Sequence, residues 1–202
     1  MAMPVEGYAA LVAEVGGCQA FPLVGYTHLL GDTNGPLSAA LLIVGEAPAR
    51  DGAVRTAVPF HGDRAGDRFE ELLTLAGLTR DGIFVTNAML CHPRGADGRN
   101  RRPRASELSA CSGYLEATLG LVQAPVVVAL GGVALAALAR IDPHGIDHVS
   151  ETAGSVRAWA GRTLVPLVHP SARTQGRRSW AQKRRPCVRL GRIVRRKVRV
   201  VD

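Results

Sequence analysis

The chain has 202 residues and a mass of 21.4 kDa, which suits one compact domain with a substantial core. Apolar residues make up 47% of it and charged residues 21%, which excludes wholesale disorder, and no apolar run reaches the roughly 18 to 20 residues that span a bilayer. The net charge of +8 comes from the end of the chain, where residues 173–202 carry 12 Lys or Arg against one Asp, while residues 1–172 carry 13 against 16 acidic residues.

The first residues contain no basic start and no apolar stretch that is typical of a secretory signal. We therefore expect a cytoplasmic protein, associated with the nucleoid if it binds DNA, in which the four cysteines are free thiols or metal ligands. The composition predicts no membrane-spanning segment, and we do not favour a membrane partner.

Four short apolar segments predict buried strands, and helical patterns alternate with them along the chain. The predicted strands are residues 40–45, 83–87, 126–130 and 164–169, and the helical patterns cover 62–76, 106–121 and 132–140. Residues 141–163 are irregular, with room for a hairpin. This alternation predicts an α/β fold: a three-layer α/β/α sandwich with a central four-stranded, mainly parallel sheet.

We assign residues 1–172 to this domain and residues 173–202 to a basic C-terminal extension, helical and packed on or beside the domain. So concentrated a positive charge favours a polyanionic partner, most simply nucleic acid. Two alternatives stay open, a solvated tail and a helix lying on a membrane surface. The second rests on apolar residues at near-helical spacing, which are Leu190, Ile193, Val194, Val198 and Val201.

Each predicted strand ends in residues that suit a binding site. The four strand ends carry Gly45-Glu46-Ala47-Pro48, Thr86-Asn87, Gly131-Gly132 and His169-Pro170-Ser171. Ligands of parallel sheets bind at the carboxyl ends of the strands. Turns and caps explain each piece singly, but together the four pieces predict one site at this edge of the sheet.

These motifs, together with residues 59–66 (Pro-Phe-His-Gly-Asp-Arg-Ala-Gly) and 99–103 (Arg-Asn-Arg-Arg-Pro), resemble the uracil-DNA glycosylase superfamily. The resemblance covers about residues 11–175 and lies in the iron–sulfur branch, with motifs intermediate between families four and five. It implies a monomeric enzyme of base excision repair that flips uracil out of double- or single-stranded DNA and hydrolyses the N-glycosidic bond, with other deaminated bases as further candidate substrates. It implies no nucleotide cofactor.

The resemblance also implies roles for named residues. Glu46, Asp63 and His169 are the candidate catalytic groups, because the sugar cation of the transition state needs nearby negative charge and the departing base needs a donor. Phe60 is expected to stack on the flipped base and Asn87 to read its amide edge.

Further contacts are implied around these groups. The remaining candidates for substrate contacts are Ala47, Asn100 and Ser171, and those for DNA contacts are Arg101, Arg173, Arg177 and Arg178. Family four uses the carboxylate at the Glu46 position and the asparagine at the Asn87 position, whereas family five uses the Asp63 and Asn100 positions. We favour Glu46 and Asn87, because the long loop of residues 93–103 displaces Asn100.

The cysteines only partly match the four thiolates that a [4Fe–4S] cluster requires. Cys18, Cys91 and Cys111 fall at three expected positions, but Phe21 occupies the fourth and cannot ligate iron. Either the basic extension folds back to donate Cys187, or the cluster is altered, or it is lost. A zinc site made of the same cysteines is a further alternative.

Two other functions remain open at this stage. One is a catalytically weak relative that binds damaged or single-stranded DNA, and the other is an N-glycosidase acting on a free nucleoside or nucleotide. The basic extension argues against the latter, because a small substrate does not need so many positive charges.

Overall fold

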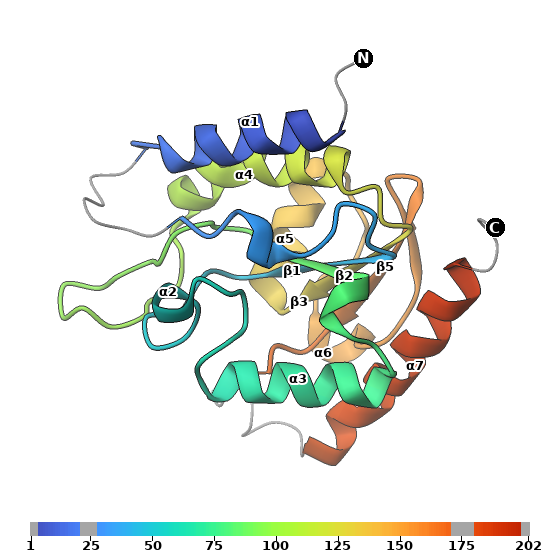
Figure 1. The fold of residues 1–202 in the computed structure, drawn as a ribbon. Helices are drawn as coiled ribbons and strands as arrows, with labels where there is room; N and C mark the ends of the chain where they lie inside the picture. Colours follow the sequence, from blue (N-terminus) through green and yellow to red (C-terminus); the bar gives the residue numbers. More distant parts are fainter. Residues whose placement is uncertain (1–3, 21–27, 171–179, 199–202) are drawn as a thin grey trace.

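The computed structural model describes residues 4–20, 28–170 and 180–198, and a five-stranded sheet forms its centre (Figure 1). The strand order is β2-β1-β3-β5-β4. The strands are β1 (Leu41–Gly45), β2 (Ile83–Asn87), β3 (Val126–Leu130), β4 (Arg157–Trp159) and β5 (Arg162–Leu167).

The four predicted strands are confirmed and pair in parallel with one another. The predicted strand count was one too low. β4 pairs antiparallel with β5 across a tight hairpin and adds a short edge strand. Its Arg157 and Ala158 are exposed, so it lacks the apolar pattern that marks the other strands.

Helices cover both faces of the sheet, as the sandwich prediction requires (Figure 1). Alternate residues of a strand point to opposite faces, so Leu42 and Val44 of β1 join one core while Leu41 and Ile43 join the other. The first core is covered by α1 (Pro4–Gly16), α4 (Ala105–Leu121) and α5 (Gly132–Ile141), and the second by α3 (Arg64–Ala76) and α7 (Trp180–Val198). Short helical turns complete the fold: η1 (Asp32–Asn34), α2 (Ala53–Thr56), η2 (Arg80–Gly82) and α6 (Val149–Thr152).

The basic helix α7 is part of the packed structure. Its Cys187, Leu190 and Val194 are buried in the second core. Gly191 lies so close to the carbonyl of Ala76 that any side chain there would overlap it. The outward face is basic and exposed, with Arg184, Arg185, Arg189, Arg192, Arg195, Arg196 and Lys197.

This packing argues against the membrane-surface alternative, because Leu190 and Val194 already contact the protein core. None of the described helices is long and apolar enough to cross a membrane.

Candidate functional site

Phe60 and Asn87 meet above Gly45 at the carboxyl edge of the sheet. Gly45 and Asn87 are register partners in the parallel pair β1 and β2, which aligns the two strand ends. A Cβ added at Gly45 would overlap Oδ1 of Asn87 and lie 2.7 Å from ring carbons of Phe60. Glycine is therefore required by the close approach of an aromatic ring and a carboxamide.

His169 completes this group from the other side of Phe60. The two rings have centroids 5.6 Å apart and are inclined by 43°. His169 follows β5 and lies against Gly131 at the end of β3, where an added Cβ would be 3.2 Å from the His169 Cβ. The ends of all four parallel strands thus contribute to one site, and Phe60 is in its middle.

The Asn87 side chain is well placed to bind a ligand. The residue is only 3% exposed, and its Oδ1 lies beside the ring of Phe60 above Gly45. A carboxamide both donates and accepts, so it can bind a flat polar group that stacks on Phe60.

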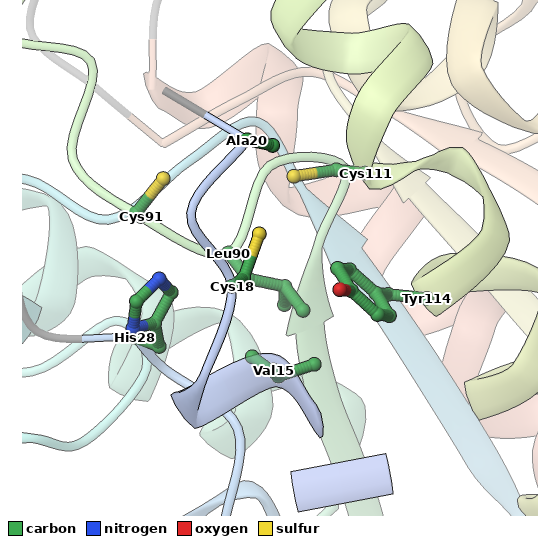
Figure 2. Close-up of a pocket in the computed structure, with 8 residues that line it drawn as sticks. All are labelled: Val15, Cys18, Ala20, His28, Leu90, Cys91, Cys111 and Tyr114. Atoms are coloured by element: carbon green, nitrogen blue, oxygen red, sulfur yellow. The ribbon is translucent and has the colours of Figure 1, made fainter. Parts of the chain in front are cut away.

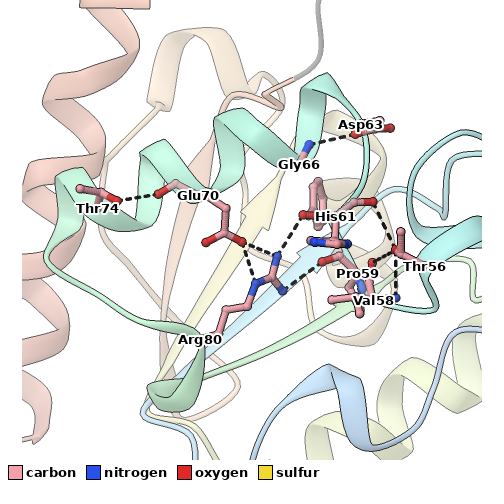
Figure 3. A network of polar contacts seen from close by, with 10 residues as sticks. Thr56, Val58, Pro59, His61, Asp63, Gly66, Glu70, Thr74 and Arg80 are labelled. Atoms are coloured by element: carbon pink, nitrogen blue, oxygen red, sulfur yellow. Dashed lines mark hydrogen bonds and ion pairs between the residues drawn. The ribbon is translucent and has the colours of Figure 1, made fainter.

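Arg80 fixes the backbone that carries Phe60 (Figure 3). Its Nη1 donates to the carbonyl of Pro59 at 3.1 Å and its Nη2 to the carbonyl of Phe60 at 3.0 Å. Nε donates to Glu70 at 2.7 Å, so a carboxylate of α3 orients the guanidinium. Phe60 itself stacks on Phe69, with centroids 4.8 Å apart.

These contacts stabilise an unfavourable conformation. Phe60 has a φ of 51°, in the left-handed region that costs a non-glycine residue about 1 to 2 kcal/mol. Two charge-assisted hydrogen bonds are sufficient to offset a cost of this size.

The two candidate carboxylates occupy different places. Asp63 is the N-cap of α3, and its Oδ1 accepts hydrogen bonds from the amides of Ala65 at 3.0 Å and Gly66 at 2.9 Å. Glu46 directly follows Gly45 and is half-buried. Asp63 therefore has a structural task at the start of α3.

Asn100 and Arg101 belong to a loop that is bound to neighbouring segments by hydrogen bonds and an ion pair. The exposed Asn100 accepts a hydrogen bond from the backbone amide of Arg50 at 3.0 Å. Arg101 forms a bidentate ion pair with the buried Glu107 of α4, which also accepts from the amide of Arg104 at 2.7 Å. Arg101 thus fastens the loop to the domain.

The Arg101 guanidinium, and then the Arg104 amide, lower the pKa of Glu107. A carboxyl whose pKa is lower in the folded state stabilises the fold above its unfolded pKa of about 4.3, and this contribution is lost as the pH falls through the folded value. We expect Glu107→Gln to lower the free energy of unfolding at pH 7 by about 1.5 to 3 kcal/mol. In urea unfolding the difference from wild type should shrink below pH 4, and an undiminished difference there would contradict this role.

Ala47 packs beside Met89, Cys91 and Cys111. Ser171, Arg173, Arg177 and Arg178 lie outside the described residues, as does Phe21.

Three of the cysteines line one small cavity between α1, α4 and the segment after β2 (Figure 2). Cys18, Cys91 and Cys111 are joined there by His28 and Tyr114. Cys187 is buried in the second core, on the opposite face of the sheet. The idea that Cys187 donates the fourth ligand is therefore wrong, because the sheet separates it from the other three.

The three thiols influence one another. Burial, followed by the neighbouring Cys111 and Cys18, raises the pKa of Cys91 to about 12. The hydrogen bond to Cys18 is the main cause that raises the pKa of Tyr114 to about 12. Among the described residues no three His, Cys, Asp or Glu side chains are grouped so as to hold a metal ion as they stand.

A larger cavity, of about 510 Å³, lies along η1 and β2. It contains none of the predicted site residues. Its lining includes Tyr8, Asn34, Arg80 and Val85.

Sequence reasoning did not single out Arg80 or His28. Nothing local marks Arg80, because its partners are about 20 residues before it. A histidine ten residues after Cys18 follows no common metal-ligand spacing.

Comparisons with known proteins show which family the chain resembles. A family model described as the uracil DNA glycosylase superfamily matches residues 33–189. A type-4 uracil-DNA glycosylase of Thermotoga maritima is 32% identical over 170 residues, covering 82% of this chain and 83% of the relative. A type-5 uracil-DNA glycosylase of Pyrobaculum aerophilum is 33% identical over 150 residues, covering 68% of this chain and 63% of the relative.

Proposed function

This chain belongs to the uracil-DNA glycosylase superfamily, and from that premise we propose that it excises uracil from DNA with the site built around Phe60. The observation that carries the proposal is the meeting of Phe60, Asn87 and His169 at one edge of the sheet. An aromatic face, a carboxamide and an imidazole together match the face and the polar edges of a pyrimidine.

Base recognition is assigned to Phe60 and Asn87. The ring of Phe60 stacks on the extruded base, and the carboxamide of Asn87 donates to uracil O4 while accepting from N3–H. The burial of Asn87 and its position next to the ring of Phe60 support this role. Cytosine presents the reverse pattern of donor and acceptor at these two atoms, so the same orientation of the amide disfavours it.

Bond cleavage is assigned to His169 and Glu46. The bond between N1 of the base and C1′ of the sugar breaks, and its electron pair leaves with the base, where His169 stabilises the developing negative charge. The Glu46 carboxylate stabilises the positive sugar and orients the water, whose oxygen bonds to C1′. The proton that this water loses balances the one the base anion gains.

The capping bonds of Asp63 support Glu46 as the carboxylate beneath the sugar. Removal of Asp63 would leave two amides at the start of α3 without their acceptor. Asp63 is better explained as the residue that fixes the start of α3.

DNA binding is assigned mainly to the exposed arginines of α7, because Arg101 is engaged with Glu107. Arginines on one helix face bind phosphates and make the affinity fall with added salt. Arg173, Arg177 and Arg178 stay predictions for the same surface.

We assign an iron–sulfur cluster to the cavity that the three cysteines line. Thiolates are the donors that such clusters require, and the donor set around this cavity fits that chemistry. When bound, the cluster supplies cross-links between the segments that carry Cys18, Cys91 and Cys111. Ala47, which packs beside two of these cysteines, connects the cavity to the loop that carries Glu46.

Arg80→Ala is expected to lower kcat/KM for uracil excision by about tenfold to a hundredfold, because the loop that carries Phe60 loses its donors. Arg80→Lys should restore only part of the activity, since an ammonium cannot reproduce both hydrogen bonds that the planar guanidinium donates to the loop. Steady-state excision measured well below the Tm of each variant tests this. The exposed Arg140 of α5 provides the matched control, and equal activities of Arg80→Ala and Arg140→Ala would contradict the role of Arg80.

The function is tested with the full chain and oligonucleotides that carry one uracil, in single-stranded and duplex form. We expect alkali to cleave the strand at the position of uracil after incubation, and not at thymine in a control strand. Salt-sensitive binding without cleavage would replace the proposal with a DNA-binding role. Release of uracil from deoxyuridine monophosphate alone would replace it with a nucleotide N-glycosidase.

A further inference from the structure

The cysteine cavity contains a fourth donor that the cysteine pattern does not include. His28 lines the cavity together with Cys18, Cys91 and Cys111. Figure 2 shows its imidazole directed toward the space into which the sulfur atoms of the three cysteines point. The cavity is thus lined by donors from three separate segments of the chain.

Backbone contacts fix His28 at this place. The amide of Leu29 donates to the carbonyl of Leu90 at 2.8 Å. His28 directly precedes Leu29 and Cys91 directly follows Leu90, so this hydrogen bond brings the two segments together. The backbone of Leu90 also hydrogen-bonds to the Cys111 sulfur. One residue, Leu90, therefore connects the segments of His28, Cys91 and Cys111.

We propose that the imidazole of His28 is the fourth ligand of an iron–sulfur cluster whose other three ligands are these cysteines. This inference rests on the cluster assigned under the proposed function. Histidine is chemically suited to the position, since imidazole replaces thiolate as an iron ligand in Rieske centres.

The donors do not stand ready to hold metal. Among the described residues no three His, Cys, Asp or Glu side chains are grouped so as to bind a metal ion as they stand. The cavity is small, about 20 Å³, which is room for about one water. Binding a cluster therefore requires its walls to move outward, and the walls that carry Cys18 and His28 are irregular backbone outside the helices and strands.

The test compares the wild-type chain with His28→Ala and His28→Cys, all produced with iron and purified without oxygen. We expect the wild type to contain iron and sulfide, to absorb in the visible range, and to show coupling to a ligand nitrogen in pulsed EPR of the reduced cluster. His28→Cys should retain iron and lose the nitrogen coupling. His28→Ala should lose most of its iron or release it to a chelator at least tenfold faster.

Two matched controls complete the design. Cys187→Ser changes a buried cysteine on the other face of the sheet and should leave the iron content and the spectrum unchanged, whereas Cys111→Ser should lose the cluster. Wild type without nitrogen coupling, His28→Ala with unchanged iron, or a chain that binds only zinc would each overturn the proposal. So would a chain that stays metal-free after reconstitution with iron and sulfide.

The failure of this inference is distinguishable from failure of the proposed function. Uracil excision by a metal-free chain would reject the ligand assignment and leave the function intact. A chain that binds iron through nitrogen but does not excise uracil would support the ligand assignment and reject the proposed function.

Discussion

Asn87→Ala is expected to lower kcat/KM for uracil excision by about a hundredfold to a thousandfold, with folding intact. The carboxamide both donates and accepts, so its removal leaves two polar atoms of the flipped base without partners in a water-poor site. Asn87→Asp should be at least as damaging, because an ionised carboxylate cannot donate to O4. Single-turnover excision of a uracil-containing oligonucleotide measures both effects.

Asn100→Ala is the matched control, since it removes the same functional group from an exposed loop. We expect less than a fivefold change, because Asn100 contacts the backbone of Arg50 rather than the group around Phe60. A large loss in Asn100→Ala together with a small one in Asn87→Ala would mean that the base is read by the other asparagine, as in family five.

His169→Ala is expected to slow bond cleavage by about a hundredfold or more, because the departing uracil anion loses its nearest donor. The effect should fall on the single-turnover rate at saturating enzyme rather than on the DNA dissociation constant. His169 also contacts Phe60, so DNA binding and the Tm are measured alongside the rate.

His148→Ala provides the control, since His148 is an exposed histidine next to α6. It should excise uracil at the wild-type rate. If His169→Ala weakened DNA binding and left the cleavage rate unchanged, the assignment of His169 to the leaving group would be incorrect.

The fold was largely predictable because the parallel strands are buried on both faces. Such strands read as continuous apolar runs, and the positions of β1, β2, β3 and β5 follow from them directly. The edge strand β4 was not predicted as a strand, because three residues with two exposed side chains carry no such run. Its existence depends on pairing with β5, which is a tertiary contact.

The sequence predicted which residues meet at the central site, but it did not predict the contacts that hold the loop of Phe60 in place. Asn87 and His169 end predicted strands, and topology alone brings such ends to one edge. The contacts of Arg80 with the loop of Phe60 depend on how that loop folds back over the sheet, which no local pattern encodes. A sequence-based assignment therefore finds the residues that we propose to touch the base and misses Arg80, whose hydrogen bonds hold the loop of one of them.

The cysteines illustrate the same limit. Counting thiols offered Cys187 as one candidate for the missing ligand, because the position of α7 relative to the sheet was unknown. The structure puts the sheet between Cys187 and the other three thiols and puts His28 beside them. Ligand identity depends on proximity in space, and among the described residues that line the cavity we propose the imidazole of His28.

The most direct test of the central claim is a crystal structure of the chain with uracil bound. The account predicts that the uracil ring stacks on Phe60, that its O4 and N3 face the carboxamide of Asn87, and that its O2 lies within hydrogen-bond distance of His169. Uracil bound instead in the cavity along η1 and β2, or bound with Asn87 and His169 out of reach, would contradict it.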